Sequence, residues 1–510
     1  MTKKRALISV SDKTGVLDLA KALIAADYEI ISTGGTAALF ADNNLPVTAI
    51  EAVTDFPECM DGRLKTLHPA IFGGLLGVLD NPEHVQTMEN HKMQAIDILV
   101  VNLYPFRKTV ENPNHTLAQA IENIDIGGPS MIRAAAKNHK YVAIVTDPSQ
   151  YTQLIDNLTS IDEKLRFKLA MEAFRYTAAY DAYISEYLRQ ISEPDVFPDT
   201  LTLTFDKHET PMRYGENPHQ AAAYYSWGQS SYKGIENAQL LHGKPLSFNN
   251  IADAHAALQV AKEFPGEAVC VAVKHATPCG VAVGADALSA YTAAYDCDPQ
   301  SIFGGIVCIN QEIDEATAQK MHEVFLEVII APAFTEGAMK VLTKKKNLRL
   351  LALPHIGKNT PAWEFKSVGG GMLVQASDDL NINDETHTTV TEKAPQKLAD
   401  LIFAMKVVKH VKSNAIVVAK DGVTLGLGGG EVSRIWAAEA AIARAGDKAK
   451  GAVLASDALF PFPDVVELCA KNGITEIIQP GGSVNDQLSI DAANARGIAM
   501  VFTGVRHFKH

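Results

Sequence analysis

Cysteine is scarce in this chain, and long apolar runs are absent. The 510 residues include six cysteines, with no Cys-x-x-Cys pair and no disulfide spacing. We therefore expect reduced, mostly buried thiols, as in proteins of a reducing compartment. No apolar run reaches the ~18 residues that a membrane span needs. The amino terminus passes from Lys3-Lys4-Arg5 straight into a strand, without a signal-peptide region. These absences predict a cytoplasmic protein that has no membrane partner.

Basic residues are outnumbered by acidic ones, 46 to 59, which gives a formal net charge of −13. A general nucleic-acid binder needs a basic stripe, so this balance predicts no nucleic-acid partner. It does not exclude small anions, because local cations and helix N-termini outweigh distant net charge. With 47% hydrophobic residues the chain can bury large cores. Its length suggests about three domains at ~150 residues each.

Two signatures of cofactor chemistry are also missing. A zinc deaminase needs His-x-Glu and Pro-Cys-x-x-Cys, but Pro278-Cys279 is followed three residues later by Ala282, and the chain has no His-x-Glu. The glycine run 425–430 resembles a dinucleotide-binding loop, yet Gly-Leu-Gly-Gly-Gly-Glu lacks the Gly-x-Gly-x-x-Gly spacing. The sequence therefore predicts no catalytic metal and no dinucleotide cofactor.

The first half of the chain alternates strands and helices. A strand at 5–10 leads through a turn to a helix that ends near 26, and a second strand at 28–32 ends in Thr33-Gly34-Gly35-Thr36. This order is typical of a parallel sheet in an α/β domain. Backbone N–H groups and hydroxyls that converge at a helix N-terminus can bind phosphate. The alternative is that the Gly-Gly pair only makes a tight turn.

Polar side chains further along this half stand at strand ends and turns. Arg63 and Lys65 would point the same way if their segment is extended. A buried strand ends in Asn102 and Tyr104, and Asp125 precedes a helix predicted for 130–139. Each could be a solvated surface group, but several at the same kind of position are typical of a site. A linker is predicted at 192–198.

In the second half, the apolar run 268–273 is typical of a buried strand, and it stops in Lys274-His275 before a predicted turn of Thr-Pro and Cys-Gly. Strand ends are where open α/β folds keep ligands, and the pair joins a cation to a group that titrates near neutral pH. These residues alone would favour two solvated groups. Asn414 also enters a predicted strand, and a helix is predicted from Arg434. No repeat of 20–50 residues is visible.

Nearly the whole chain resembles one family, on motifs that follow one another in order. The first half carries Ser-Val-Ser-Asp-Lys-Thr-Gly at 9–15, Gly-Arg-Leu-Lys-Thr-Leu-His-Pro at 62–69, Asn-Leu-Tyr-Pro-Phe at 102–106, Asp-Ile-Gly-Gly at 125–128 and Arg-Ala-Ala-Ala-Lys-Asn-His at 133–139. The second half carries Arg-Tyr-Gly-x-Asn-Pro-His-Gln at 213–220, Lys-His-x-x-Pro-x-Gly at 274–280, Lys-Ser-Asn-Ala at 412–415 and Arg-x-Phe-x-His at 506–510. Together they resemble the bifunctional AICAR formyltransferase/IMP cyclohydrolase family of purine biosynthesis.

The resemblance implies two reactions. Residues 200–510 would move a formyl group from 10-formyltetrahydrofolate to the 5-amino group of AICAR, and residues 1–195 would close the product, FAICAR, to IMP with loss of water. It implies a methylglyoxal-synthase-like parallel α/β domain, then a transformylase region of two cytidine-deaminase-like α/β subdomains with a boundary near 360–395. It also implies a homodimer with the transformylase site at the interface, and it allows a structural monovalent cation.

The resemblance assigns residues as well. For formyl transfer, His275 is the expected base, Lys274 the cation at the oxyanion or the folate nitrogen, and Asn414 the residue that orients them. For ring closure the expected catalytic residues are Lys65, Thr66, Tyr104, Asp125 and Lys137. Expected substrate-binding residues are Ser11, Lys13, Thr14, Thr33, Gly34, Gly35, Thr36, Arg63, Asn102 and Gly127 in the first half, and Arg213, Tyr214, His219, Asn250, Gly304, Glu327, Arg434, Arg506 and Phe508 in the second.

Some positions depart from the family's pattern. Glu327 stands where some relatives have Asp, and Ala276, Thr277 and Cys279 vary the turn after Lys274-His275. The alternative function is a non-catalytic nucleotide-binding regulator that shares the first domain's fold. Such a binder would need neither Lys274-His275 nor Asn414.

Overall fold

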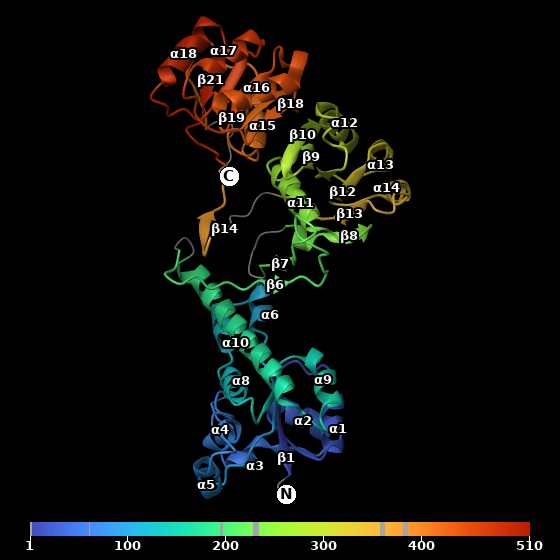
Figure 1. Cartoon of the computed structure of the whole chain (residues 1–510), viewed down its shortest axis with the longest axis vertical. Coiled ribbons are helices and arrows are strands. Elements are labelled where there is room, and N and C mark those ends of the chain that lie inside the picture. The colour runs from blue at the N-terminus through green and yellow to red at the C-terminus, as the bar shows by residue number, and fades with distance from the viewer. Residues whose placement is uncertain (1–2, 61, 194–196, 228–233, 358–362, 381–385) are drawn as a thin grey trace. The chain divides into compact units, whose positions relative to one another are not determined.

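The chain divides into two compact units, Met1–Thr204 and Phe205–His510 (Figure 1). The computed structural model describes residues 3–60, 62–193, 197–227, 234–357, 363–380 and 386–510. The linker predicted at 192–198 and the boundary predicted at 360–395 lie partly outside these residues. Each unit has its own sheets and hydrophobic cores, so each is described by itself.

Unit 1 is built on a five-stranded sheet in which every neighbouring pair is parallel, in the order β3-β2-β1-β4-β5. Its strands are β1 Lys4–Val10, β2 Tyr28–Ser32, β3 Thr48–Ala49, β4 Ile98–Asn102 and β5 Ala143–Val145. The predicted parallel α/β domain is confirmed. The strand order reverses at β1, which lies between β2 and β4, and ligands of open α/β sheets bind at such a point.

Helices cover both faces of this sheet. They are α1 Val16–Ala25, α2 Gly34–Asp42, α3 Ile50–Thr54, α4 Pro69–Leu76, α5 Pro82–Asn90, α6 Phe106–Glu111, α7 Leu117–Glu122, α8 Gly127–Lys137, α9 Tyr151–Asp156 and α10 Glu163–Ser192, with a 3-10 turn η1 at Pro148–Gln150. Because side chains alternate along a strand, Ile8 of β1 packs into a core with α1, α2 and α9, while Leu7 packs into a second core with α4 and α8. The helix predicted to begin at 130 begins earlier, at Gly127.

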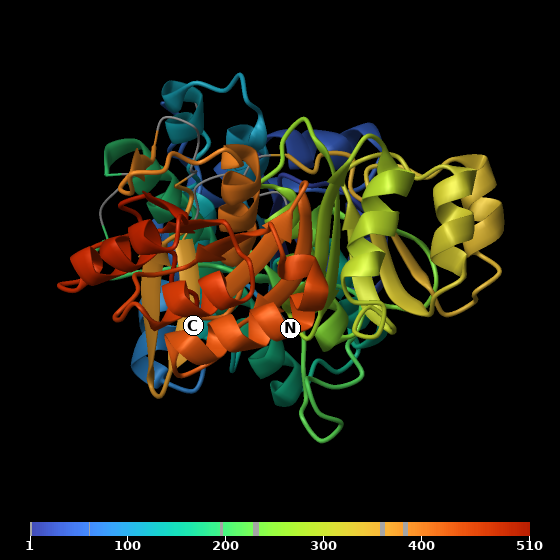
Figure 2. The same cartoon turned by 90° about the horizontal axis from the view of Figure 1, so that it is seen from above.

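Unit 2 contains one 12-stranded sheet made of two halves with the same connectivity. The first half has the order β10-β9-β11-β12-β13-β8, with β8 Gln239–His242, β9 Ala268–Lys274, β10 Thr277–Gly284, β11 Gly305–Ile309, β12 Leu326–Ala331 and β13 Arg349–Ala352. The second has the order β18-β17-β19-β20-β21-β16, with β16 Thr388–Thr389, β17 Ile416–Lys420, β18 Val423–Gly428, β19 Val453–Ser456, β20 Glu476–Gln479 and β21 Ala499–Phe502. The halves meet where β10 pairs with β18 in antiparallel fashion. Figure 2 shows them, green and orange, next to one another.

The helices of unit 2 repeat in the same way. The first half has α11 Phe248–Ala261, α12 Ala287–Cys297, α13 Glu315–His322 and α14 Glu336–Leu342, and the second has α15 Leu398–Val408, α16 Arg434–Ala445, α17 Asp464–Lys471 and α18 Asp486–Ala495. Shorter elements are β6 Asp206–Lys207 with β7 Tyr225–Ser226, the hairpin β14 Trp363–Val368 with β15 Gly371–Ala376, and the 3-10 turns η2 Ile235–Asn237 and η3 Gly446–Ala449. Each half is therefore an α/β layer with the same order of strands and helices.

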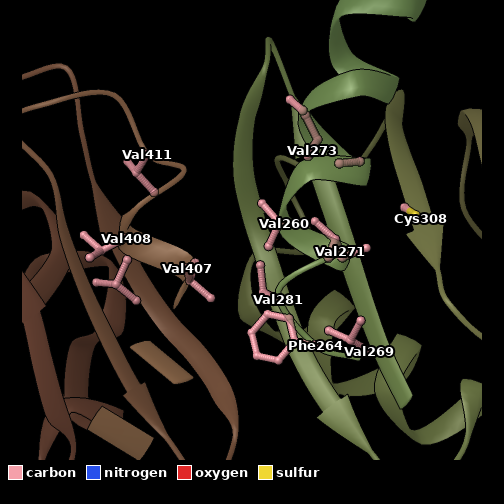
Figure 3. Close-up of a cluster of buried hydrophobic side chains, with 14 of the residues drawn as sticks. Val260, Phe264, Val269, Val271, Val273, Val281, Cys308, Val407, Val408 and Val411 are labelled. Carbon is pink, nitrogen blue, oxygen red and sulfur yellow. The ribbon is translucent and has the colours of Figure 1, made fainter. Parts of the chain in front are cut away.

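One hydrophobic core joins the two halves. Figure 3 shows part of it: Val271 and Val273 of β9, with Val407 and Val408 of α15 on the other side. The rings of Phe264 and Phe403 lie 5.5 Å apart within the same core. The opposite face of the sheet has a separate core in each half, against α12–α14 and α16–α18. The shared core fixes the two halves as one scaffold.

The glycine run at 425–430 is not a loop but mostly a strand, which corrects the resemblance to a nucleotide-binding turn. A Cβ on Gly426 would lie 2.1 Å from the carbonyl oxygen of Ala441, and one on Gly428 would lie 2.0 Å from that of Ala437. Helix α16 therefore packs directly on the backbone of β18. Glycine is required at these positions because there is no space for a side chain between helix and strand.

Two candidate active sites

The first site lies in unit 1, at the carboxyl ends of β1, β2 and β4. Asn102 ends β4 and is buried, and its side-chain oxygen accepts hydrogen bonds from the backbone N–H groups of Ser11 (2.6 Å) and Asp12 (2.9 Å). Its amide nitrogen donates to the carbonyl of Asp12 at 2.9 Å. Asn102 thus fixes the turn that carries Ser11, Lys13 and Thr14. Asn102 therefore has a structural role in addition to its predicted contact with the substrate.

The Thr33–Thr36 segment forms the start of α2. Thr36 Oγ1 donates to the carbonyl of Val10 at 3.0 Å, and the hydroxyls of Thr33 and Ser9 lie 2.8 Å apart. These hydroxyls already have protein partners, so the free donors here are the first backbone N–H groups of the helix. A Cβ on Gly35 would lie 3.4 Å from Lys13 Nζ, and one on Gly34 would lie 4.0 Å from Lys65 Nζ. Two ammonium groups therefore converge on a helix N-terminus, which favours an anion.

The segment that carries Arg63 is a turn, not an extended strand, so the predicted alignment of Arg63 with Lys65 is wrong. Cys59 pairs with Leu64 across this turn. Arg63 forms an ion pair with Glu122 on an exposed surface. Thr66 is buried, and its hydroxyl would lie 2.9 Å from a Cβ on Gly127. The absence of a side chain at Gly127 therefore leaves space for the Thr66 hydroxyl.

Asp125 lies at the beginning of α8, beside this group. Its carboxylate accepts hydrogen bonds from the backbone N–H groups of Gly128, at 2.8 Å, and of Tyr104. Burial raises the pKa of the Asp125 carboxyl above its ordinary value, although the two N–H groups and the charge of Lys65 oppose the shift. A carboxyl with a raised pKa is suited to general acid–base work. Tyr104, Asp125 and Lys65 are thus brought together.

Lys137 is not brought to this group within unit 1. It is the last residue of α8, which is 11 residues long, so ~15 Å separates it from the helix start at Gly127. Lys137 instead lines a surface hollow of about 550 Å³ together with Arg133, His139 and Phe174. The sequence motif 133–139 gave no sign of this separation, because it does not say where the helix begins.

The second site lies along one edge of the sheet in unit 2. At this edge the first half presents the end of β9 and the beginnings of β11, β12 and β13. Because β10 and β18 are antiparallel, the second half presents the beginning of β17 and the ends of β19, β20 and β21 at the same edge. Lys274, Gly304, Glu327, Asn414 and Phe508 all stand at or next to these strand ends. Residues about 140 positions apart in the chain thereby share one edge.

His275 lies in the tight turn between β9 and β10. The predicted Thr-Pro and Cys-Gly turn is wrong, because those residues begin β10, and the turn itself is His275-Ala276 with φ values of 52° and 56°. Positive φ at both central residues is the type I′ hairpin geometry, which normally selects Asn or Gly. Two L-residues there are strained, and such strain concentrates at functional sites.

Asp253 of α11 stabilises this turn. Its carboxylate accepts a hydrogen bond from the backbone N–H of Ala276 at 2.6 Å and another from the N–H of His275. Burial raises the pKa of the Asp253 carboxyl, whereas these bonds and the neighbouring His275 and Lys274 side chains oppose the shift. Sequence reasoning missed Asp253, since one aspartate in a helix gives no signal of a turn 22 residues later.

Lys274 is held by the loop that precedes β11. Its ammonium donates to the carbonyls of Gly304 at 2.9 Å and Phe303 at 3.2 Å. A Cβ on Gly304 would lie 3.0 Å from that nitrogen, and Gly304 has a φ of +68°. Glycine is therefore favoured at 304 both by the close approach of Lys274 and by the left-handed backbone conformation. An ammonium has three donors, which leaves one N–H of Lys274 for a ligand.

Asn414 belongs to a buried hydrogen-bond network. Its side-chain oxygen accepts from Arg434 at 2.8 Å, and its amide nitrogen donates to the carbonyl of Glu431 at 2.8 Å. Arg434 also donates to the carbonyl of Ala415 at 3.0 Å and forms an ion pair with Asp457, which is fully buried. Arg434 was expected to shape the substrate site, and the structure shows that it also positions Asn414. Asp457 was missed by sequence reasoning.

The carboxy-terminal tail returns to this network. The backbone N–H of His507 donates to the carbonyl of Asp457 at 2.9 Å, and Ser413 exchanges two hydrogen bonds with the backbone of Lys509 at 2.9 and 3.1 Å. These contacts bring Arg506 and Phe508 to the Asn414 turn, with the Arg506 guanidinium 4.4 Å from the centre of the Phe508 ring.

Glu327 and Asn250 meet at the beginning of β12. The Asn250 amide donates to the Glu327 carboxylate at 2.8 Å, and Arg349 at the start of β13 lies 3.8 Å from the same oxygen. Arg349 is a further residue that sequence reasoning missed. Among the described residues, no hydrogen bond or ion pair connects Arg213, Tyr214 or His219 to this edge.

A buried charge cluster supports the helix before Asn414. Glu263 accepts from His410 at 2.8 Å and from Lys409 at 3.0 Å, and all three side chains are nearly inaccessible to solvent. Burial lowers the pKa of His410, and the charges of Lys509 and Lys409 act in the same direction against the effect of Glu263. The cluster connects α11 of the first half to α15 of the second.

In the part of the chain that the structure describes, no three His, Cys, Asp or Glu side chains are grouped as they would be to hold a metal ion. A structural monovalent cation stays a prediction. No helix among the described residues is long and apolar enough to cross a membrane.

Comparison with known proteins decides the family. The model of the MGS-like domain matches residues 15–130, and that of the AICARFT/IMPCHase bienzyme matches residues 135–444. The chain belongs to the AICARFT/IMPCHase bienzyme family. It is 56% identical to the bifunctional purine biosynthesis proteins PurH of Bacillus cereus (strain AH820), Bacillus anthracis (strain A0248) and Bacillus thuringiensis (strain Al Hakam), over all of this chain and all of each relative. A crystal structure of ForH matches 36% of this chain and 96% of its own at 30% identity, with a TM-score of 0.34 that is too low to bear on the fold.

Membership of this bienzyme family confirms the resemblance found in the motifs. The chain is a bifunctional enzyme of purine biosynthesis, an AICAR formyltransferase and IMP cyclohydrolase, and the formyltransferase activity requires a folate co-substrate. The MGS-like domain agrees with the parallel sheet of unit 1. The alternative of a non-catalytic nucleotide-binding regulator is removed.

Proposed function

We propose that the two units divide the two reactions. Unit 2 would transfer the formyl group of 10-formyltetrahydrofolate to the 5-amino group of AICAR, and unit 1 would close the resulting FAICAR to IMP. The observation that carries this division is the geometry of Lys274 and His275, whose groups stand at the same sheet edge as Asn414. The ammonium groups at the N-terminus of α2, those of Lys13 and Lys65, and the Asp125 carboxyl of raised pKa belong to unit 1.

Formyl transfer needs a base and an electrophilic donor. The amine of AICAR is conjugated to a carboxamide and is a weak nucleophile, so it must lose a proton as its nitrogen attacks the formyl carbon. His275 would take that proton, and the remaining N–H of Lys274 would stabilise the oxyanion or protonate N10 of the folate as the C–N10 bond breaks. Asn414, held by Arg434, would orient the formyl oxygen.

Ring closure requires less of the protein, because both reacting groups belong to one molecule. The carboxamide nitrogen attacks the formyl carbon, a proton moves to the oxygen, and water leaves. Asp125 would hold or move that proton, and Lys65 with Thr66 and Tyr104 would stabilise the developing charge. The N-terminus of α2 with Lys13 would bind the phosphate, with Arg63 nearby. Lys137 lines a separate hollow, so it takes no part in this step within unit 1.

The AICAR phosphate in unit 2 would be bound by Arg213 and Arg506, with Tyr214, His219, Gly304 and Phe508 around the substrate. Asn250 and Glu327 would contact the ribose or base. Support for the second half of this assignment comes from the tail contacts that bring Arg506 and Phe508 to the Asn414 turn. The two halves of unit 2 would be the two deaminase-like subdomains, since their strand orders match.

We also infer a homodimer whose transformylase site lies at the interface. Val432, Trp436 and Phe462 are 86%, 52% and 59% exposed, and Val432 directly follows Glu431, which bonds Asn414. Large apolar side chains gathered on a surface mark interaction sites. In unit 1, Phe167, Met171 and Phe174 of α10 are exposed as well. The family and the six free cysteines support a cytoplasmic location.

The test compares wild type with His275→Ala and Lys65→Ala, given AICAR and 10-formyltetrahydrofolate or supplied FAICAR. His275→Ala should lose formyl transfer by about 10²-fold or more and still cyclise FAICAR, and Lys65→Ala should do the reverse. Lys274→Ala should likewise lose formyl transfer and still cyclise FAICAR. Its matched control is Lys420→Ala, because Lys420 precedes the equivalent β17–β18 turn at the opposite edge. Loss of both activities in His275→Ala without unfolding would refute the division.

A further inference from the structure

Two loops of unit 1 carry Tyr104 and Asp125. Tyr104 lies in the segment 103–105, between β4 and α6, and Asp125 lies in the segment 123–126, between α7 and α8. The backbone N–H of Tyr104 donates to the carboxylate of Asp125, so the two loops meet at this contact. Tyr104 is 42% exposed. Its loop therefore joins Asp125 through the backbone and leaves the phenol accessible to a ligand.

The long helix α10 holds both loops through two tyrosines. The backbone N–H of Leu103 donates to the hydroxyl of Tyr176 at 3.0 Å, and that of Asp125 donates to the hydroxyl of Tyr180 at 2.8 Å. The Tyr180 hydroxyl in turn donates to the carbonyl of Asn123 at 3.1 Å. Because residues four apart lie on one face of a helix, the two hydroxyls reach neighbouring loops from a single surface of α10.

The two tyrosines are themselves fixed by packing. Both rings pack against the core that contains Ala170 and Ala173 of α10. The Tyr180 ring also lies edge-to-face with Phe106, with the ring centres 6.4 Å apart. Burial raises the pKa of both phenols, that of Tyr180 to about 12. Each phenol therefore stays protonated at neutral pH, and Tyr180 keeps the O–H that it donates.

Loss of either hydroxyl would leave a backbone N–H without its acceptor. An unpaired N–H in a partly buried site is costly, so the loop would move until that N–H found another partner. Both loops join at the single contact between Tyr104 and Asp125, and movement of either loop would disturb the same contact. A displacement of ~1 Å can reduce the rate of an oriented reaction by ~10²-fold.

We propose that Tyr176 and Tyr180 are positioning residues for ring closure, which hold Tyr104 and Asp125 together at the substrate. This inference rests on the proposed roles of Tyr104 and Asp125 in closing FAICAR. Neither tyrosine of α10 needs to touch the substrate, because each hydroxyl bonds the backbone of a loop. The effect should therefore fall on kcat, whereas the KM for FAICAR should change little, since the phosphate would bind at the N-terminus of α2.

The experiment measures kcat and KM for cyclisation of supplied FAICAR in Tyr176→Phe, Tyr180→Phe and the double variant. Each substitution removes one oxygen and keeps the ring. Each single variant should lower kcat by about tenfold and keep KM within about twofold of wild type. The double variant should also lose about tenfold, not about a hundredfold, because both hydroxyls support one contact and their effects are then not additive. Formyl transfer should be unchanged in all three.

Tyr187→Phe is the matched control on the same helix. The Tyr187 ring lies 5.5 Å from that of Phe106, and its hydroxyl bonds a ring nitrogen of His115 at 2.8 Å. His115 belongs to the segment between α6 and α7, which carries none of the residues assigned to ring closure. The variant should change the urea midpoint about as much as Tyr180→Phe does, and it should keep the wild-type kcat for cyclisation.

The outcomes separate the inference from its basis. A kcat within about twofold of wild type in Tyr176→Phe or Tyr180→Phe, losses that multiply in the double variant, or an equal loss in Tyr187→Phe would each overturn the positioning role. A rise in KM without a fall in kcat would do the same. Wild-type cyclisation by Asp125→Asn or Tyr104→Phe would instead remove the proposed roles of those two residues. If those variants lose cyclisation and the α10 variants do not, the proposed function stands and only this inference fails.

Discussion

Asp253 should increase the rate of formyl transfer without touching the substrate. Its carboxylate bonds the N–H groups of both residues of the His275-Ala276 turn, where two L-residues have positive φ. A left-handed conformation costs ~1–2 kcal/mol per L-residue, and a hydrogen bond to a charged group contributes ~1.5–3 kcal/mol. Without the carboxylate, His275 would leave its position for a relaxed turn. We expect Asp253→Asn to lower kcat by roughly thirtyfold, which corresponds to ~2 kcal/mol.

The internal repeat supplies a matched control. In the second half, Asp400 of α15 accepts a hydrogen bond at 2.9 Å from Gly422 in the β17–β18 turn, where Asp421 and Gly422 have positive φ. Asp400→Asn removes the negative charge from the same kind of contact, in a turn that has no catalytic side chain. It should lower stability to a similar extent, as measured by urea unfolding, and leave formyl transfer nearly intact.

A rescue tests the cause. Glycine adopts positive φ without cost, so adding Ala276→Gly to Asp253→Asn should restore part of the lost kcat. Cyclisation of supplied FAICAR should stay unchanged throughout. The reasoning fails if Asp253→Asn retains kcat within twofold of wild type, or if Asp400→Asn loses formyl transfer equally.

Three further predictions concern the same unit. Asp457→Asn leaves the buried guanidinium of Arg434 without its ionic partner, so unit 2 should lose ~3 kcal/mol in urea unfolding. Formyl transfer should also fall, because Arg434 would no longer hold Asn414 in place. An unchanged urea midpoint would contradict this. Gly428→Ala should reduce stability by ~3 kcal/mol or prevent folding, because its Cβ would overlap a helix carbonyl, whereas Gly370→Ala, with open space around the added Cβ, should be neutral. The pKa of His410 is lowered in the folded state, so its contribution to stability is complete above the unfolded pKa near 6.5 and is lost as pH falls through the folded value. The free energy of unfolding should therefore drop from ~pH 7.5 to ~pH 5. A His410→Gln variant should show a flatter plot of unfolding free energy against pH.

Much of the fold of unit 1 could be predicted because its signals are local. Buried strands are continuous apolar runs, and glycine and polar turns separate them from helices. The positions after β1, β2 and β4 followed from this order, since the carboxyl ends of parallel strands meet at one edge. The exceptions were the Arg63 turn and the start of α8, and both depend on contacts that period and composition do not encode.

The transformylase site was predicted by motif, not by geometry. Lys274-His275 and Asn414 could be named from the sequence, but the turn was placed two residues too late. A strand followed by Thr-Pro and Cys-Gly favours a turn at those residues. Tertiary structure prevailed, because Asp253 stabilises the strained His275-Ala276 turn and Thr277–Gly284 pairs along β9.

The amino-acid sequence by itself determined the α/β class, the strands, the family and the reactive side chains, because each depends on residue type and short-range spacing. Only the tertiary structure decided that residues about 140 positions apart stand at one edge. That depends on the antiparallel pairing of β10 with β18 and on the core shared by α11 and α15. It also assigned Asp253, Asp457 and Arg349 their tasks and explained the glycines of β18. Such roles arise from long-range packing and hydrogen bonding, whose free energy no local pattern records.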